Sequence, residues 1–184
     1  MKKKTLIISE ITGFFVVATG VLLLWNIYEL TDRSTLGVVF GAVNSSVWER
    51  AKCISICFML CGLCELLCVR VYFRTFVVSK TLGLCVSLLS FIIPESILGA
   101  DTYAEFLVLS VSVLCGFGCS YLLTVLSVNL RQLFAPACFL LMLIFMMTFS
   151  FTAFAPKLWL FRDPYTGCYG VVPRSFDMGA VYLG

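Results

Sequence analysis

Five apolar stretches, each long enough to cross a bilayer, take up more than half of this 184-residue chain. A helix needs about 20 apolar residues to span roughly 30 Å of hydrocarbon. A soluble fold could not hide so much apolar surface, because 61% of the residues are hydrophobic and only 12% are charged. We therefore expect an all-α polytopic transmembrane bundle of five helices. Residues 1–155 would form this transmembrane domain, and residues 156–184 a tail that packs on it. The expected helices cover residues 6–28, 47–69, 76–93, 103–128 and 135–155.

The charges between these stretches are sorted by sign, which predicts an orientation. Segments on one side carry only basic residues: Lys2, Lys3, Lys4, Arg70, Arg74, Lys80 and Arg131. Segments on the other side hold most of the acids: Glu29, Asp32, Glu49, Glu95, Asp101, Glu105, Asp163 and Asp177. Cytoplasmic loops collect Lys and Arg, so we expect a cytoplasmic N-terminus and an extracytoplasmic tail. The net charge of +3 reflects this topology, and no nucleic-acid partner is expected.

Local signals refine the helix ends. Residues 46–49 and 102–105 match the capping box, in which a Ser or Thr and a Glu satisfy each other's backbone donors. Pro94 is expected to end or kink its helix. Residues 36–43 are apolar but too short to span, so they would lie on the membrane surface or dip into the bundle.

The second stretch carries a stripe of five cysteines, Cys53, Cys57, Cys61, Cys64 and Cys68, on one face of a helix. One interpretation is a thiol ladder for a soft ion such as Cu(I), or for redox chemistry. The other is a seam of small residues against which another helix packs. The seam is favoured, because a ladder needs thiolates and hydrocarbon disfavours them. The chain has no histidine, which excludes histidine-ligated sites, and we expect neither metal nor cofactor.

Glu10 and Glu65 are acids inside the apolar stretches, where ionisable groups are functional candidates by default. Both lie one to two turns from the expected cytoplasmic end. Glu10 could reach the basic N-terminus, and Glu65 could bond across to the first helix or reach Arg70. Structural pairing is favoured over a proton relay.

The extracytoplasmic side has the richest set of polar groups. The candidate ligand-binding residues are Glu29, Asn44, Trp48, Glu49, Lys52, Arg162, Asp163 and Tyr169. Carboxylates beside a Lys or Arg could bind a cation, position a polar head group or act as an acid–base pair, with Glu49 and Asp163 as its members. The structural alternative is that Glu49 caps a helix, and that Asp163 opens a turn completed by Gly167 and Gly170.

Two segments carry a resemblance to a known family. They are N-S-S-V-W-E at 44–49 and F-x-D-P-x-T-G-x-Y-G at 161–170. The chain resembles, over most of its length, a family of small integral membrane proteins that is common in Firmicutes and known only as a domain of unknown function. The resemblance implies a multi-pass protein of the bacterial cytoplasmic membrane and implies no activity. Members often have histidines where this chain has Arg50 and Lys157, so any metal site built on them would be absent here.

Three functions remain open. The first is small-solute or ion transport, or ligand binding, through the extracytoplasmic site, with a polar path toward Glu65. The second is an accessory subunit that packs against itself or a partner membrane protein. A membrane enzyme acting on a lipid or envelope substrate ranks last, because no nucleophile, metal or acid–base spacing is recognisable. The expected partners are the lipid bilayer, a second copy of the chain or a partner membrane protein, and a small-molecule ligand that the sequence does not identify. Cys168 would be a free thiol or an intermolecular bridge.

Overall fold

The protein folds into an all-α structure, seen in a computed structural model that describes residues 3–68, 72–98, 102–126 and 130–171. Five helices are long and apolar enough to cross a membrane, which confirms the expected fold class. They are α1 (Lys3–Leu30), α3 (Val47–Cys68), α4 (Phe73–Leu98), α5 (Thr102–Val125) and α6 (Phe134–Ala153). Short helices occupy the connections: α2 (Thr35–Phe40), η1 (Leu130–Leu133) and η2 (Trp159–Phe161). Several residues used to predict the orientation lie outside the described residues: Lys2, Arg70, Asp101 and Asp177.

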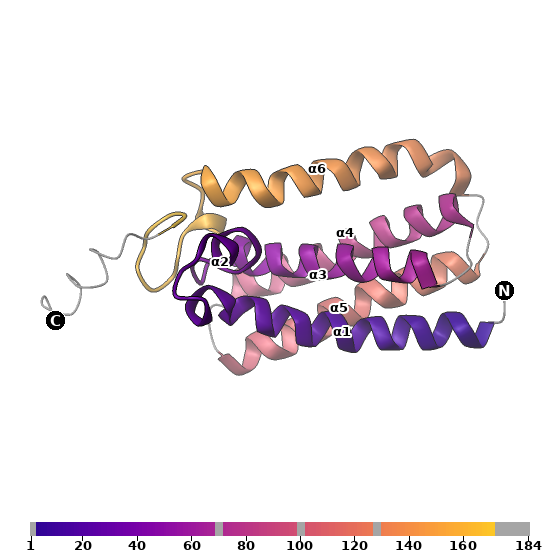
Figure 1. The fold of residues 1–184 in the computed structure, drawn as a ribbon, viewed down its shortest axis with the longest axis horizontal. Coiled ribbons are helices and arrows are strands. Elements are labelled where there is room, and N and C mark those ends of the chain that lie inside the picture. Colours follow the sequence, from indigo (N-terminus) through magenta and orange to yellow (C-terminus); the bar gives the residue numbers. More distant parts are fainter. Residues whose placement is uncertain (1–2, 69–71, 99–101, 127–129, 172–184) are drawn as a thin grey trace, which may run out of the picture.

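Four of the long helices form a ring in which each contacts two others, in the order α1, α3, α4, α5 and back to α1. The fifth, α6, packs on the outside of this ring against α4 and α3 (Figure 1). The helices alternate in direction, so α1 begins at one end of the bundle while α2 and η2 lie at the other (Figure 1). We call these the amino-terminal end and the tail end.

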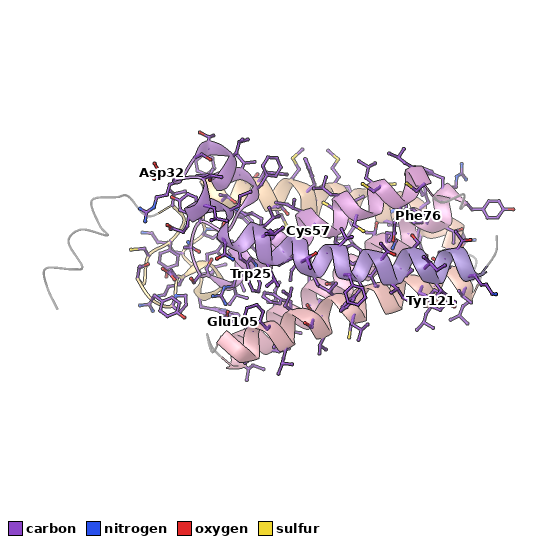
Figure 2. All side chains as sticks on the ribbon, turned by 60° about the horizontal axis from the view of Figure 1, so that its bottom comes forward. Trp25, Asp32, Cys57, Phe76, Glu105 and Tyr121 are labelled. Atoms are coloured by element: carbon purple, nitrogen blue, oxygen red, sulfur yellow. The ribbon has the colours of Figure 1, made fainter. Side chains whose placement is uncertain are left out.

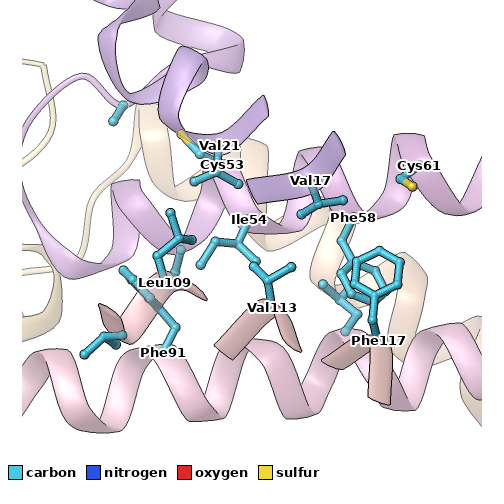
Figure 3. Packing of buried hydrophobic residues seen from close by; sticks show 14 residues of the cluster. Val17, Val21, Cys53, Ile54, Phe58, Cys61, Phe91, Leu109, Val113 and Phe117 are labelled. Atoms are coloured by element: carbon cyan, nitrogen blue, oxygen red, sulfur yellow. The ribbon is translucent and has the colours of Figure 1, made fainter. Parts of the chain in front are cut away.

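An apolar layer fills the middle of the ring. It contains Val17, Val21, Ile54, Phe91, Leu109 and Val113, all at most 2% exposed. Figure 3 shows these side chains meeting between the helices, with the rings of Phe58 and Phe117 beside them. The two rings are tilted by 40° and their centroids are 4.7 Å apart. The layer separates the polar groups at the two ends of the bundle.

The closest helix pair, α4 and α5, meets through small residues. A Cβ atom added to Gly83 would lie 2.6 Å from the carbonyl oxygen of Gly116, and one added to Gly116 would lie 2.7 Å from Cβ of Ser87. The two backbones therefore approach as closely as glycine allows. Such close packing supplies van der Waals contact, which helices in a bilayer depend on because lipid tails are as apolar as their side chains.

Two expectations about helix ends need correction. The helix expected over residues 76–93 does not end before Pro94, because α4 continues through it to Leu98; the alternative, a kink at Pro94, stays a prediction. Lys80 does not mark a loop either. It lies seven residues inside α4, is only 8% exposed, and is held there by acids on neighbouring helices.

Residues 36–43 do not span the bundle. Most of them form α2, which Ser34 caps by accepting a hydrogen bond from the Gly37 amide. The Ala42 amide donates to the carbonyl of Leu24, so the segment is fastened to the tail end of α1. The helix α2 also contacts α6, so α1, α2 and α6 meet at the tail end.

Candidate functional site

Lys52 on α3 is the centre of a buried network at the tail end. Its ammonium lies 2.6 Å from Oε2 of Glu49 and also donates to the Val38 carbonyl (3.3 Å) and to Oγ1 of Thr152 (3.0 Å). Glu49 accepts further hydrogen bonds from the Val43 amide and the Thr152 hydroxyl. All three ammonium protons thus have acceptors, which is the condition for burying this charge. We call these five residues the Lys52 network; it joins α2, α3 and α6.

The capping box at residues 46–49 forms only in part. The Glu49 amide donates to Oγ of Ser46 at 3.4 Å, as expected. The reciprocal bond is replaced, because the Ser46 amide donates to Oδ1 of Asn44 and the Glu49 carboxylate faces Lys52. Glu105, from the second expected box, forms an ion pair with Arg50.

The tail loop is closed by its own aspartate. Oδ1 of Asp163 accepts from the Tyr165 amide, and Oδ2 accepts from the Thr166 amide and hydroxyl. Gly167 and Gly170 adopt φ values of 70° and 69°, which glycine reaches without strain. This is the structural alternative that the sequence suggested for Asp163. A single antiparallel bridge joins Arg162 to Tyr169.

The loop is attached to the bundle at two places. Phe161 is buried between Trp48 and Phe151, with ring centroids 5.1 and 5.3 Å away. The Asn44 side chain donates to the carbonyl of Gly170 at 2.9 Å. The two sequence segments that carried the family resemblance are therefore in contact with each other.

A cavity of about 660 Å³ opens beside this junction, between α2, the end of α6 and the tail. Thr152 and Tyr169 supply its polar side chains, and Val38, Val39 and Phe149 part of its apolar wall. Of the candidate ligand-binding residues, Tyr169 alone lines it. Lys52 and Glu49 lie behind Thr152, and Trp48 and Asp163 hold the loop. We call this space the tail-end cavity.

Glu29 stands apart from these groups. Its side chain is 71% exposed and pairs with Arg33 one turn later, at 3.7 Å. An exposed pair of this kind adds little stability.

A second group at the tail end was not expected from the sequence. The guanidinium of Arg50 contacts both Glu95 (3.2 Å) and Glu105, and lies 5.4 Å from the ring centroid of Trp25. We call these four residues the tail-end charge cluster. Each helix of the ring contributes one of them, and Figure 2 shows Trp25 and Glu105 toward this end.

The two intramembrane acids meet at the amino-terminal end, on Lys80. Its ammonium lies 2.8 Å from Oε2 of Glu10 and 2.5 Å from Oε2 of Glu65, the latter without hydrogen-bond geometry. The remaining carboxylate oxygens accept from Ser120 (3.2 Å) and Ser9 (3.1 Å). We call these five residues the amino-terminal charge cluster. Glu65 thus does bond across to the first helix, whereas Glu10 pairs with Lys80.

Aromatic rings complete this cluster. The Lys80 ammonium lies 4.6 Å from the ring centroid of Phe117, and less than 6 Å from those of Phe58 and Phe76. Such contacts favour a cation in a place that water does not reach.

The cysteine stripe faces α1 along part of its length. A Cβ atom added to Gly20 would lie 3.1 Å from the sulfur of Cys57, so α1 packs closely there. Cys53 and Cys61 are buried, whereas Cys64 and Cys68 are exposed. Within the described residues no group of three His, Cys, Asp or Glu side chains is arranged to hold a metal ion.

One comparison with known proteins gives a match. The sequence model of a protein family described as "Family of unknown function (DUF6512)" matches residues 1–171. No curated protein and no solved structure matches the chain.

Proposed function

The chain belongs to the family of unknown function DUF6512, and we propose that it is a multi-pass membrane protein that binds a small solute at its tail end. The observation that carries this proposal is the tail-end cavity of about 660 Å³, which has the size of an ordinary small-molecule site. The cavity lies where α2, α6 and the tail meet, so a ligand would touch three segments at once.

The lining of the cavity indicates the class of ligand. Among the residues that the structure describes, no charged side chain lines it, whereas the hydroxyls of Thr152 and Tyr169 and the backbone around Gly170 offer hydrogen bonds. A bare ion would find no counter-charge among these residues. An uncharged or weakly amphipathic solute, with one or two polar groups and an apolar body, fits these walls.

The Lys52 network supports this site from behind. Thr152 lines the cavity and also bonds both Lys52 and Glu49. A ligand that takes a hydrogen bond from Thr152 would compete with Glu49 for the same proton. Ligand binding would therefore change the hydrogen bonds by which Thr152 joins α6 to α3.

Native mass spectrometry of the protein released from lipid nanodiscs tests the proposal. We expect a bound small molecule to survive in the wild type and to be lost in Ala153→Trp, which fills the cavity. Ala135→Trp is the matched control, because Ala135 is also an exposed alanine of α6 but lies at the amino-terminal end. Equal ligand occupancy in both variants would reject the site.

Ligand binding is favoured over transport by the apolar layer. The cavity that reaches Glu65 is lined by residues of α1 and α3, and by none from the tail end. Transport would require this apolar layer to open.

The second candidate function is that of an accessory subunit. It is favoured because Lys52 and Arg50 already form ion pairs within the bundle. A stoichiometric partner that co-purifies equally well with wild type and Ala153→Trp would favour that role.

The proposed orientation places the amino-terminal end in the cytoplasm of a bacterial cell. Of the basic residues that the structure describes at the tail end, Arg33, Arg50 and Lys52 are paired with acids, whereas Lys157 and Arg162 are exposed. Lys4 and Arg74, at the other end, are exposed. Alkaline phosphatase fused after residue 184 should be active, since it folds only outside the cytoplasm. Fluorescence of a green fluorescent protein fused at the same place would show that the tail lies in the cytoplasm and contradict the proposed orientation.

A further inference from the structure

The amino-terminal charge cluster is not electrically balanced. Two carboxylates, Glu10 and Glu65, share one ammonium, Lys80. When all three are ionised, they carry a net charge of −1 in the interior of a bundle that faces lipid. Each carboxylate also has acceptor capacity that its single serine hydroxyl and Lys80 do not fill. The cluster therefore favours one more positive charge nearby.

A groove on the outside of the ring leads to Glu10. It lies between α1 and α5, has a volume of about 450 Å³, and includes the aromatic rings of Phe14, Phe117 and Tyr121. Apart from Glu10 and the Tyr121 hydroxyl, its lining is apolar. Gly118 leaves part of it open, because a Cβ atom added there would meet nothing within 4 Å.

These features select among positive charges. A small metal ion needs several oxygen ligands, which this groove does not supply. A lipophilic organic cation needs one counter-charge, apolar walls and aromatic faces, and it reaches the groove through the bilayer. We propose that the groove between α1 and α5 binds a lipophilic organic monocation, with its charge beside Glu10 and its apolar body against Phe14, Phe117 and Tyr121.

The site is separate from the tail-end cavity, so the two proposals can fail independently. Equilibrium dialysis of tetraphenylphosphonium against the protein in nanodiscs, with empty nanodiscs subtracted, measures the binding. Tetraphenylborate has the same shape and the opposite charge. We expect one tetraphenylphosphonium per chain, and at least about tenfold weaker binding of tetraphenylborate, from the sign of the charge alone.

Two variants test the two parts of the site. Glu10→Gln removes the counter-charge and should weaken tetraphenylphosphonium binding at least about tenfold. Gly118→Leu fills the groove but leaves the charged groups in place, so it should also weaken binding while the protein keeps its thermal stability.

Each variant has a matched control. Glu105→Gln removes the same charge from the tail-end charge cluster, and Gly62→Leu fills an equally open position beside a different groove, between α3, α4 and α6. Both should bind within about twofold of the wild type, since neither residue touches the site. Ala153→Trp should behave in the same way. No binding to the wild type, equal binding of tetraphenylborate, or equal losses in Glu10→Gln and Glu105→Gln would each overturn the proposal.

Discussion

The ammonium of Lys80 lies 2.8 Å from the Glu10 carboxylate, although 70 residues separate them in the sequence. The same ammonium reaches Glu65 on α3. One buried contact therefore fixes how three helices face one another at the amino-terminal end. At the tail end, Arg50 has the same role toward Glu95 and Glu105.

Replacing Lys80 with methionine should strongly destabilise the protein. The change leaves two buried carboxylates without a counter-charge, and breaking a buried pair in this way costs about 3–5 kcal/mol. Thermal unfolding in detergent measures the loss. The triple variant Glu10→Gln, Glu65→Gln, Lys80→Met should recover most of the stability, since no charge then remains. A triple variant no more stable than Lys80→Met would show that the ion pairs are not the cause.

The Lys52 network should respond in a graded way. Lys52→Met leaves Glu49 buried without its ammonium, for a loss of about 3–5 kcal/mol. Thr152→Val removes the one hydroxyl that bonds both charged groups and should cost about 1–3 kcal/mol, less than the loss of the ammonium. Unfolding in detergent ranks the two variants, and equal losses would argue against charge as the dominant interaction.

The contact between α4 and α5 should not tolerate a side chain at Gly116. Leucine there would collide with Ser87 and the Gly83 carbonyl, at a cost of about 1–3 kcal/mol or more. Gly118→Leu, two residues along the same helix, should leave the melting temperature nearly unchanged because its position is open. Thermal melts of the two variants, compared side by side, are the test.

The cysteines of α3 should differ in reactivity along the stripe. N-ethylmaleimide should modify Cys64 and Cys68 well before Cys53, because only the first two are exposed. Peptide mass spectrometry over a time course gives the order. A seam also predicts that the purified protein retains no stoichiometric Cu(I) after desalting. Copper that protects all five cysteines together would instead support the thiol ladder.

The sequence was sufficient to predict the helices, because hydropathy over 20 residues depends little on any one side chain. It predicted the start of α3 at Val47, from the capping signal before it. It placed the end of the helix at residue 93, whereas α4 runs through Pro94 to Leu98. A membrane helix tolerates a proline because neighbouring helices and local adjustments satisfy the freed backbone groups.

The two charge clusters could have been inferred from how many residues each charged side chain lies from the end of its helix. The sign of the charge alone was not enough. Arg50, Glu95 and Glu105 each lie three residues from the tail end of their helices, in α3, α4 and α5. Glu10 and Lys80 each lie seven residues from the opposite end, about 10 Å along the helix at 1.5 Å per residue. Because Lys80 was assigned to a loop on the basis of its charge, its equal depth with Glu10 was missed. The partners of Asp163 are local and follow the turn signal in the sequence. The contact between Glu49 and Thr152, 103 residues further along the chain, is tertiary, and no local pattern encodes it.

The order of the charges along the chain has a consequence for biosynthesis. When α1 and α3 enter the bilayer, Glu10 and Glu65 have no basic partner, and Arg50 has no acid from a later helix. Each such uncompensated charge costs about 2.5–3.5 kcal/mol near a helix centre, and less near its ends. The arrival of α4 supplies Lys80 to one group and Glu95 to the other. Membrane integration of α4 is thus the step at which both groups of buried charges first gain an oppositely charged partner.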